Sequence, residues 1–572
     1  MDLRFIGADA TEAERAAVEA AVPPALTVDT PGRVVRIQRS MRHHLLPAID
    51  AVQSQIGWVS PGAIDEIARR LQVPPAEVYS VATFYALVST EPRPEAVAHV
   101  CDDIACGGDL LEALAGRDDV VPSPCLGQCD RRPAAFLQRA GGEDLVVTGA
   151  GSKTVIEGLA GEPVEHHPTH VSAGPLLARI GEVDPLSLED YRARGGYQAL
   201  PRAIEMGPDA VLGELEVSNL RGRGGAAFPI GIKWRGAHTQ PPPRYLVCNA
   251  DESEPGTFKD RVVMEGDPYS VIEAMTVAGL TIGADHGYLY IRGEYPTATA
   301  RLRHAVATAR AEGLVGDDVM GSGRAFDIEI RRGQGAYICG EETALFASIE
   351  GYRGEPRQKP PFPTVSGLFG RPTVINNVET LINVLRVVVE GGDAYAATGT
   401  PESTGTRLFC LSGDVGRPGV YEFESGTTLG AALEAAATSK DDIAYVLLGG
   451  AAGAMTDTRH WDMPLTFEDS RAEGVTLGSG VIMAFGPHRD MVEVVRRIAQ
   501  FFRDESCGQC VPCRVGTARV EEAVARANGA VEADLIEDID RAMKDASICG
   551  LGHTAGSVVL TAIDLGILGQ KT

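Results

Sequence analysis

The sequence predicts a multidomain chain that combines α/β domains with all-α parts. Its 572 residues exceed what one hydrophobic core organises and correspond to about four domains. With 44% hydrophobic and 23% charged residues, its composition is that of an ordinary globular protein. Helical patterns lie near both ends, and segments that read strand, glycine loop, helix lie between them. These observations favour several cores joined in one chain.

Composition changes along the chain indicate where the domains meet. We expect an unpatterned leader at 1–35, a helical bundle at 36–95, a small βα domain at 96–165, a linker at 166–200, a glycine-rich α/β domain at 201–400, a strand–turn–strand–helix domain at 401–490 and a helical domain at 491–572. His166, His167 and His170 in the linker are possible metal ligands, but a solvated linker rich in Gly, Pro and His is the favoured interpretation.

Charge excludes several classes of partner. The formal net charge of −26 argues against nucleic acids and anionic membranes, because phosphates must be met by clustered Lys and Arg. The start, "MDLRFIGADATEAERAAVEAAV", has acidic residues where a secretory signal carries a basic stretch and an apolar run. No window offers ~18 uninterrupted apolar residues. We therefore expect a cytoplasmic protein with no nucleic-acid partner and no membrane contact of its own.

Cysteines form two groups of four. The chain has eleven, an odd number that does not suit a disulfide framework, and in a reducing compartment clustered cysteines indicate metal or redox chemistry. The groups are Cys101, Cys106, Cys125 and Cys129 near the front, and Cys507, Cys510, Cys513 and Cys549 at the back. Cys248, Cys339 and Cys410 lie alone in apolar or glycine-rich runs, where we expect small buried hydrophobes.

The back group has the spacing of an iron–sulfur site. In "ESCGQCVPCR" the pattern C-x2-C-x2-C lets a short loop bind three corners of a cubane, and a remote cysteine supplies the fourth. Cys549 in "DASICGLGHTAGS" is the candidate, since likely helices precede both loops. Zinc is the main competitor, but its ligands usually come as two C-x2-C pairs. The spacing therefore favours iron–sulfur over zinc.

The front group reads C-x4-C followed by C-x3-C, which differs from the plant-ferredoxin order. Two pairs of thiolates suit a [2Fe-2S] rhomb, with one pair from each of two loops. Zinc is again the alternative. A second cysteine tetrad in the same chain favours electron transfer, because sequential redox centres need each other and two structural zinc ions do not.

A glycine-rich loop between the two groups has the features of a phosphate-binding loop. "SNLRGRGGAAFPIGIKW" places Gly222, Gly224 and Gly225 around Arg223, and glycines let backbone N–H groups approach an anion closely. Arg223 and Lys233 add positive charge. The loop is neither G-x-G-x-x-G nor a P-loop, and tight turns alone explain many such loops.

Taken together, the motifs resemble a known family. The matching stretches are the glycine loop, "CNADESEPGTFKDR", "GAYICGEETAL", "PPFP", "INNVET", "ESCGQCVPCR" and "ICGLG", in order from Leu212 to Gly552. They resemble the NADH-oxidising flavoprotein subunit of respiratory complex I and the diaphorase subunits of NAD-linked formate dehydrogenases and NAD-reducing hydrogenases. Arg36 to Ala160 is similar to the family's separate thioredoxin-like [2Fe-2S] subunit. The chain thus looks like a fusion of the two subunits.

The resemblance implies a fold and a set of cofactors. The expected order is a helical bundle with a thioredoxin-like [2Fe-2S] domain, a Rossmann-like FMN and NAD(H) domain, a β-grasp domain, and a helical bundle with a [4Fe-4S] cluster. It implies FMN contacts at Gly222, Arg223, Gly224, Gly225, Lys233, Asn249, Asp251, Tyr337, Gly340, Glu341, Asn376 and Asn377. NADH is expected to stack on Phe228 and Phe362, with its ribose and phosphates held by Glu254, Glu342 and Lys359. Carboxylates at the ribose favour NAD over NADP.

The implied activity is hydride transfer between NAD(H) and FMN and single-electron transfer between FMN and the clusters. We expect no side-chain acid or base in the chemical step. The short gap between Cys106 and Cys125, "CLGQCDRRPA" and "DYRARGGYQAL" are more like the formate dehydrogenase and hydrogenase diaphorases than the complex I subunits. Of the two, we expect the diaphorase of a molybdenum or tungsten formate dehydrogenase. An NAD-reducing hydrogenase and complex I are the alternatives, and a zinc-stabilised scaffold protein is the alternative of another class.

The implied partner is a large catalytic subunit with further iron–sulfur clusters, either a molybdopterin formate dehydrogenase or a hydrogenase.

One position departs from the family pattern. Complex I subunits usually carry an aromatic residue two places after "KW" to hold adenine, and Gly236 stands there.

Overall fold

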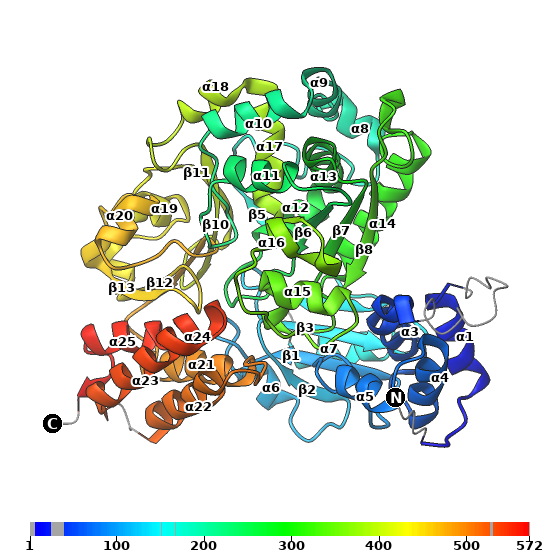
Figure 1. The fold of residues 1–572 in the computed structure, drawn as a ribbon. Coiled ribbons are helices and arrows are strands. Elements are labelled where there is room, and N and C mark those ends of the chain that lie inside the picture. Colours follow the sequence, from blue (N-terminus) through cyan, green and yellow to red (C-terminus); the bar gives the residue numbers. More distant parts are fainter. Residues whose placement is uncertain (1–5, 24–38, 150, 166, 527–529, 571–572) are drawn as a thin grey trace.

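The computed structural model describes residues 6–23, 39–149, 151–165, 167–526 and 530–570. Figure 1 shows the middle α/β domain above, the two cysteine-bearing domains below it, and the second large sheet to one side. His166 and residues 1–5 and 24–35 of the expected leader lie outside the described residues.

The front of the chain begins with helices. They are α1 (Glu12–Ala21), η1 (Arg39–His44), α3 (Leu45–Ile56), α4 (Pro61–Leu71) and α5 (Pro75–Ala82). Helix α1 corrects the prediction of an unpatterned leader. Its first turn is closed by a capping box, in which Thr11 and Glu14 each accept the other's backbone N–H. Val18 on its inner face is fully buried and belongs to the same core as Val52 of α3, so this segment folds onto the bundle.

A four-stranded sheet follows, in the order β2-β1-β3-β4. The strands are β1 (Ala96–Cys101), β2 (Val120–Ser123), β3 (Ala134–Arg139) and β4 (Leu145–Thr148), with short helices α6 (Asp109–Ala113) and α7 (Ser152–Leu159). Strand β1 runs parallel to β2 and antiparallel to β3. The first tetrad cysteine therefore lies where the central strand ends, beside the loop that leaves β2.

The middle domain is a doubly wound parallel sheet in the order β8-β7-β6-β9. Its strands are β6 (Tyr245–Ala250), β7 (His286–Ile291), β8 (Asp327–Arg332) and β9 (Thr373–Asn377). In chain order this is 3-2-1-4, the Rossmann-like arrangement. All its strands are parallel, and the order in which they are added changes direction between β6 and β9. Ligands bind outside the carboxyl ends of strands at such a reversal.

Helices surround this sheet. They are α8 (Leu188–Ala193), α9 (Ala199–Met206), α10 (Pro208–Val217), α11 (Ile230–His238), α12 (Lys259–Gly266), α13 (Pro268–Ile282), α14 (Pro296–Ala311), η2 (Val319–Gly321), η3 (Tyr337–Gly340), α15 (Glu342–Ile349), α16 (Pro363–Ser366), η4 (Leu368–Gly370), α17 (Val378–Glu390) and α18 (Gly392–Ala396). Only α13, α14 and α17 among them exceed ten residues. Every residue of α13 is buried, because other helices pack against it as well as the sheet.

The third sheet has the order β13-β12-β14-β10-β11-β5. It is built from β5 (His170–Val171), β10 (Thr406–Gly413), β11 (Gly419–Glu424), β12 (Tyr445–Leu448), β13 (Ala454–Asp457) and β14 (Val481–Phe485), with α19 (Leu429–Ala435), η5 (Lys440–Asp442), η6 (Thr458–His460) and α20 (Phe467–Ala472). Strand β5 comes from the segment predicted to be a solvated linker. It pairs in parallel with β11, so this part of the linker is an edge strand.

The chain ends in helices α21 (Met491–Asp504), α22 (Val511–Arg526), α23 (Ala533–Ala546), α24 (Gly550–Thr554) and α25 (Ser557–Asp564), with a short pair β15 (Ala530–Val531) and β16 (Gly569–Gln570). In Figure 1 these helices lie below the third sheet, on the opposite side of the front sheet from the N-terminal helices. Among the described residues, none of the helices combines the length and the apolar character needed to span a bilayer.

Candidate functional site

Two of the predicted asparagine side chains lie at the carboxyl ends of β6 and β9, where the strand order changes direction. Asn249 at the end of β6 is in register with Asn377 at the end of β9. The Asn249 amide donates to the carbonyl oxygen of Gly340 at 2.9 Å. Asn377 caps α17 by accepting the N–H of Glu379 at 3.0 Å. These contacts bring three predicted FMN residues to one edge of the sheet.

The glycine loop is held against the start of α17. The backbone N–H of Arg223 donates to the hydroxyl of Thr380 at 2.8 Å. A Cβ on Gly224 would lie 3.0 Å from the Cβ of Asn377, and Gly225 has a φ of +109°. Glycine is therefore required for this approach, and the loop lies beside a helix N-terminus, which favours anions.

The Arg223 side chain does not face this edge, contrary to the prediction that its charge helps to bind a phosphate. It is only 1% exposed. Its guanidinium donates to the carbonyl oxygens of Thr404 at 2.7 Å and Thr406 at 3.1 Å. Arg223 thus fastens the loop to Thr404 and to Thr406, the first residue of β10 in the third sheet.

Lys233 and Asn376 lie behind the loop. The Lys233 ammonium donates to the carbonyl oxygen of Ile375 at 2.6 Å, and burial lowers its pKa. Asn376 accepts the indole N–H of Trp234 at 2.8 Å. The "KW" pair of α11 is therefore fixed to two adjacent residues near the end of β9.

Asp251 is the clearest candidate to bind a ligand. Among the described residues its Oδ2 atom is buried and has no hydrogen-bond partner, and burial raises the pKa of this carboxyl well above its usual range. A Cβ on Gly340 would stand 3.6 Å from that oxygen, so the glycine leaves room beside it. An unpaired buried carboxylate is costly. The hydroxyls of a ribityl chain or a flavin N–H would satisfy it, so this edge fits FMN.

Two carboxylates and a lysine form a second polar group at the start of α15. Glu341 caps the helix by accepting the N–H groups of Thr343 at 2.8 Å and Ala344 at 2.9 Å. The Lys359 ammonium donates to Glu341 at 3.1 Å and to Glu342 at 2.9 Å. This arrangement brings together Glu341, Glu342 and Lys359 as predicted, and it offers both acceptors and a cation to a dinucleotide.

Glu254 is fastened to the third sheet. Its Oε1 accepts the N–H of Ala452 at 2.8 Å and its Oε2 the hydroxyl of Ser479 at 2.7 Å. Burial raises its pKa. Each carboxylate oxygen accepts more than one hydrogen bond, so Glu254 keeps acceptor capacity for a ribose while it also joins two domains.

Two predicted stacking rings project from the surface. Phe228 is 52% and Phe362 is 60% exposed, although large aromatic residues are usually well buried. Gly236 lies in α11, and a Cβ there would approach only Thr364, at 3.9 Å. The position where the resemblance leads us to expect an aromatic residue is therefore open.

The front cysteines converge at the end of β1. The Sγ atoms of Cys125 and Cys129 lie 3.4 Å apart. The neighbouring Cys106 and Cys125 thiols raise the pKa of Cys101. Asp103 joins the two loops, since its carboxylate accepts the N–H of Cys125 at 2.9 Å, and burial raises its pKa to about 6.

The back cysteines surround one small cavity. Cys507 and Cys510 precede α22, Cys513 lies in its first turn, and Cys549 is the N-cap of α24. All four line the same cavity, with Leu551. Within the described ranges, no three His, Cys, Asp or Glu side chains are arranged to hold a single metal ion. Four thiols around a shared cavity fit a cluster of several irons, whose ligands bind different iron atoms.

The flavin edge and the back cysteines are directly connected. The backbone N–H of Tyr337 donates to the Glu505 carboxylate at 3.0 Å, and the Tyr337 ring packs edge-on against Phe501 of α21 at 5.0 Å. Burial raises the pKa of Glu505 to about 7. Glu505 stands two residues before Cys507, so one short segment touches both predicted cofactor sites.

Sequence analysis missed the residues that fasten the front cysteine loop. Arg261 and Arg292 bind its backbone, and Asp103 bridges its two halves. Arg261 ends the quoted "CNADESEPGTFKDR" stretch and Asp103 lies inside "CDDIAC", so both were visible within motifs. Arg292 follows a plain apolar strand and carries no local signal.

Comparison with known proteins identifies the domains in which these residues lie. Family models match at residues 215–386 (Nuo51 FMN-binding domain), 493–565 (NADH-ubiquinone oxidoreductase-F iron-sulfur binding region), 33–117 (thioredoxin-like [2Fe-2S] ferredoxin) and 408–443 (SLBB domain). The NAD-reducing hydrogenase HoxS subunit alpha of Cupriavidus necator is 33% identical over 560 residues, 92% of this chain and 91% of that relative. The chain belongs to this diaphorase family.

A second relative and a solved structure agree with this match. The F subunit of the NADH-quinone oxidoreductase of Aquifex aeolicus is 41% identical over 396 residues, 68% of this diaphorase and 92% of that protein. A crystal structure titled as an NAD+-reducing [NiFe]-hydrogenase in the H2-reduced state superposes with a TM-score of 0.78, at 33% identity, and covers 92% of this chain and 93% of that one.

These matches confirm several predictions. The diaphorase is an NADH:acceptor oxidoreductase subunit that carries FMN, a [4Fe-4S] and a [2Fe-2S] cluster. Its fusion of a ferredoxin-like front with a flavoprotein is confirmed, and the region predicted to be a β-grasp domain matches an SLBB domain. The reported relatives belong to hydrogenases and complex I, so the preference for formate dehydrogenase receives no support from them.

Proposed function

We propose that this chain is the NAD(H)-reacting subunit of a cytoplasmic NAD-reducing hydrogenase complex, and that it exchanges electrons with a large metal-containing partner. The observation that carries the proposal is the nearly end-to-end match to the hydrogenase subunit alpha. The NADH-quinone oxidoreductase relative from Aquifex aeolicus matches only 68% of the chain. A formate dehydrogenase is the second candidate, because the short segment between Cys106 and Cys125, "CLGQCDRRPA" and "DYRARGGYQAL" resemble the diaphorases of both complexes.

Bound FMN supplies the chemistry that joins a two-electron hydride to one-electron carriers. The residues of the chain bind and orient. Asp251 and Asn249 offer an acceptor and a donor at the sheet edge, and the Gly222–Gly225 loop with the start of α17 suits a phosphate. Direct hydride transfer from a nicotinamide needs only such binding groups, correctly placed.

The dinucleotide would lie along the exposed side of the same edge. The rings of Phe228 and Phe362 offer stacking surfaces, and Glu342 accepts ribose hydroxyls while Lys359 meets a phosphate. The Glu342 carboxylate also repels a 2′-phosphate, which favours NAD over NADP. These roles follow from exposure, charge and the contacts at the start of α15.

Electrons would leave through the back tetrad. The hydrogen bond from the Tyr337 N–H to the Glu505 carboxylate connects the flavin edge to the segment that carries Cys507. Cys507 and Cys510 are partly exposed, and Val511 beside them is 59% exposed. We therefore assign this surface to the partner that holds further iron–sulfur clusters.

Two single cysteine variants test the electron route. In the anaerobically reconstituted chain, Cys549→Ser should abolish the [4Fe-4S] EPR signal while the FMN content stays. NADH-dependent reduction of ferricyanide should persist, because the flavin itself reduces it, and electron delivery to the co-purified partner should fall at least tenfold. Cys410→Ser is the matched control, because Cys410 is buried outside both tetrads. An unchanged cluster signal in Cys549→Ser contradicts the fourth-ligand assignment.

The parent complex is identified by its metal. The large subunit that co-purifies with the tagged chain should contain nickel and should support hydrogen-dependent reduction of NAD+. Molybdenum or tungsten with formate-dependent reduction would replace the hydrogenase proposal with the formate dehydrogenase one. A colourless preparation with two zinc ions per chain would overturn the oxidoreductase assignment itself and favour the scaffold alternative.

A further inference from the structure

The loop from Cys125 to Cys129 is held by buried arginines of the flavin domain. Arg292, just after β7, donates from Nη2 to the carbonyl oxygen of Cys125 at 2.8 Å and from Nη1 to that of Glu252 at 2.7 Å. Its side chain is 3% exposed. A single guanidinium thus joins a predicted cluster ligand to the loop that follows β6.

A second arginine binds the same loop two residues further on. Arg261 of α12 donates from Nε to the carbonyl oxygen of Gly127 at 3.0 Å and from Nη2 to the Asp130 carboxylate at 2.8 Å. Gly127 itself is pressed against α14, because a Cβ there would lie 2.1 Å from the hydroxyl oxygen of Tyr295. The cysteine loop is therefore fixed to the flavin domain along its whole length.

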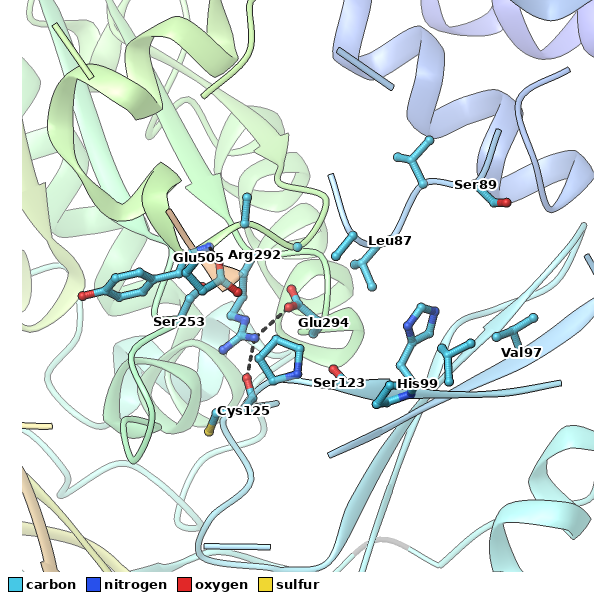
Figure 2. A pocket seen from close by; sticks show the side chains of 18 of the residues that line it. Leu87, Ser89, Val97, His99, Ser123, Cys125, Ser253, Arg292, Glu294 and Glu505 are labelled. Atoms are coloured by element: carbon cyan, nitrogen blue, oxygen red, sulfur yellow. Dashed lines mark hydrogen bonds and ion pairs between the residues drawn. The ribbon is translucent and has the colours of Figure 1, made fainter. Parts of the chain in front are cut away.

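The charge of Arg292 is only partly neutralised. Glu294 accepts from Nη2 of Arg292 at 2.7 Å, and both side chains line a cavity of about 340 Å³ between the front domain and the flavin domain (Figure 2). Among the described residues, Oε2 of Glu294 and Nε of Arg292 have no partner. Figure 2 shows the guanidinium bonded to both Glu294 and the carbonyl of Cys125. The Arg292–Glu294 ion pair therefore contacts the Cys125 backbone through its cationic member, and its anionic member lies on the same guanidinium nitrogen.

We propose that Arg292 and Glu294 set the reduction potential of the front cluster, with Arg292 as the residue that also positions Cys125. Reduction adds one negative charge to the cluster. A cation hydrogen-bonded to a ligand's carbonyl stabilises that reduced form, and a carboxylate beside it opposes the effect. Burial makes both contributions stronger than they would be in water. The inference rests on the [2Fe-2S] assignment, not on which complex contains the chain.

The pair predicts shifts of opposite sign, which a purely structural role would not produce. In the full reconstituted chain, an equilibrium redox titration followed by EPR should give a lower midpoint potential for Arg292→Gln and a higher one for Glu294→Gln. The double variant should lie between them, since it removes a cation and an anion together. Arg310→Gln is the control. Its ion pair with Asp327 is similar in length but about half exposed, and no shift is expected there.

Equal signs for the two single variants, or unshifted potentials at full cluster content, would overturn the inference. Arg292→Gln removes a contact to Cys125 and can cost cluster content. Glu294→Gln keeps the arginine, so a rise in its potential still supports the inference and an unchanged value or a fall contradicts it. Failure of the wild-type chain to show a [2Fe-2S] signal would overturn the cluster assignment and this inference together, and that result is visible before any variant is made.

Discussion

Asp251 illustrates how a single side chain indicates a ligand site. Its carboxyl is buried, and its Oδ2 atom has no partner in the described part of the chain. The raised pKa follows from burial, which disfavours the charged form. Stable proteins rarely leave a carboxylate in this state, so its position beside Asn249 and Gly340 indicates the place that FMN fills.

Replacing Asp251 should affect the flavin-free and flavin-bound forms in opposite directions. The folded-state pKa is raised above the aspartate value of 3.8, so the folded form holds its proton to higher pH and loses stability as pH rises above that value. Asp251→Asn removes this loss and should raise the unfolding temperature of flavin-free protein at pH 8. It should weaken FMN binding by about tenfold, ~1.4 kcal/mol, because an amide NH2 group replaces one of the two carboxyl oxygens.

Calorimetry of flavin-free protein and FMN titration by fluorescence measure the two effects. Asp267→Asn is the control, since Asp267 is also buried but bonds to Arg179 outside the flavin edge. It should leave FMN affinity unchanged and should lower stability by breaking that pair. Unchanged FMN affinity in Asp251→Asn would remove this residue from the site.

At this scale the sequence predicted residue identity better than side-chain direction. The eight cysteines lie in two groups as their spacing indicates, including Cys549 across a long gap. Arg223 was assigned to a phosphate because it lies among glycines, but its guanidinium faces the third sheet. The carbonyls that attract it come from residues about 180 positions later, and no local pattern reports them.

Among the elements, the loop of the front tetrad is tightly packed at one of its glycines. Gly127 has a φ of +64°, and an added Cβ would collide with Tyr295. Gly107 has nearly the same φ, +68°, with open space around it. A side chain at Gly127 would therefore cause both backbone strain and a steric clash, whereas a side chain at Gly107 would cause backbone strain alone.

Alanine at these glycines should have unequal effects. Gly107→Ala should cost about 1 kcal/mol of stability from backbone strain alone. Gly127→Ala should also push the loop away from α14, lower [2Fe-2S] content severalfold and reduce the unfolding temperature further. Acid-labile sulfide assays and thermal scans on both variants measure this. Equal losses in the two variants would show that the close contact with Tyr295 is unimportant.

Element prediction failed where the signal was weak or lay far away. Helix α1 was missed because it lies in an acidic segment with little apolar periodicity, although Thr11 and Glu14 form a capping box. Strand β5 was missed for a stronger reason. Its two residues lie among Pro, Gly and His, and only pairing with β11 makes them a strand.

For the whole molecule, the front and back halves are joined by more than the chain that links them. Arg261 and Arg292 bind the front cysteine loop, and Arg497 of α21 bonds to Asp102 at 2.5 Å. Arg332 of β8 also forms an ion pair with Asp144. Several of these contacts are buried, so salt should screen them weakly.

Cutting the connection should therefore leave one particle. A protease site inserted between the exposed residues Glu162 and Pro163 should allow complete cleavage, with both fragments eluting together in size-exclusion chromatography at 1 M salt. The same site placed in a variant with both Arg261→Gln and Arg292→Gln is the comparison and should release the front fragment at a lower urea concentration, because the contacts of Arg332 and Arg497 remain. Separation of the fragments without these substitutions would show that the link, not the interface, holds the halves together.

The order of domains was predictable because each carries its own motif, and the family matches follow the same order. The interfaces between domains were not predictable. They depend on long side chains such as Arg292 and Glu254 that leave one domain and bond to another. Arg292 looks no different from a surface charge in the sequence, and Glu254 was expected to bind a ribose, with no sign of its bonds to the third sheet.

Pairing of β5 with β11 has a consequence for synthesis. The edge strand leaves the ribosome roughly 250 residues before its neighbour does, which at ordinary elongation rates of 5–20 residues per second is about 12–50 s. During that interval the front domain can already collapse, but the segment behind it stays without the partner that orders it. The front cysteines are therefore complete in the nascent chain before Arg261 and Arg292, which fasten their loop, have been synthesised.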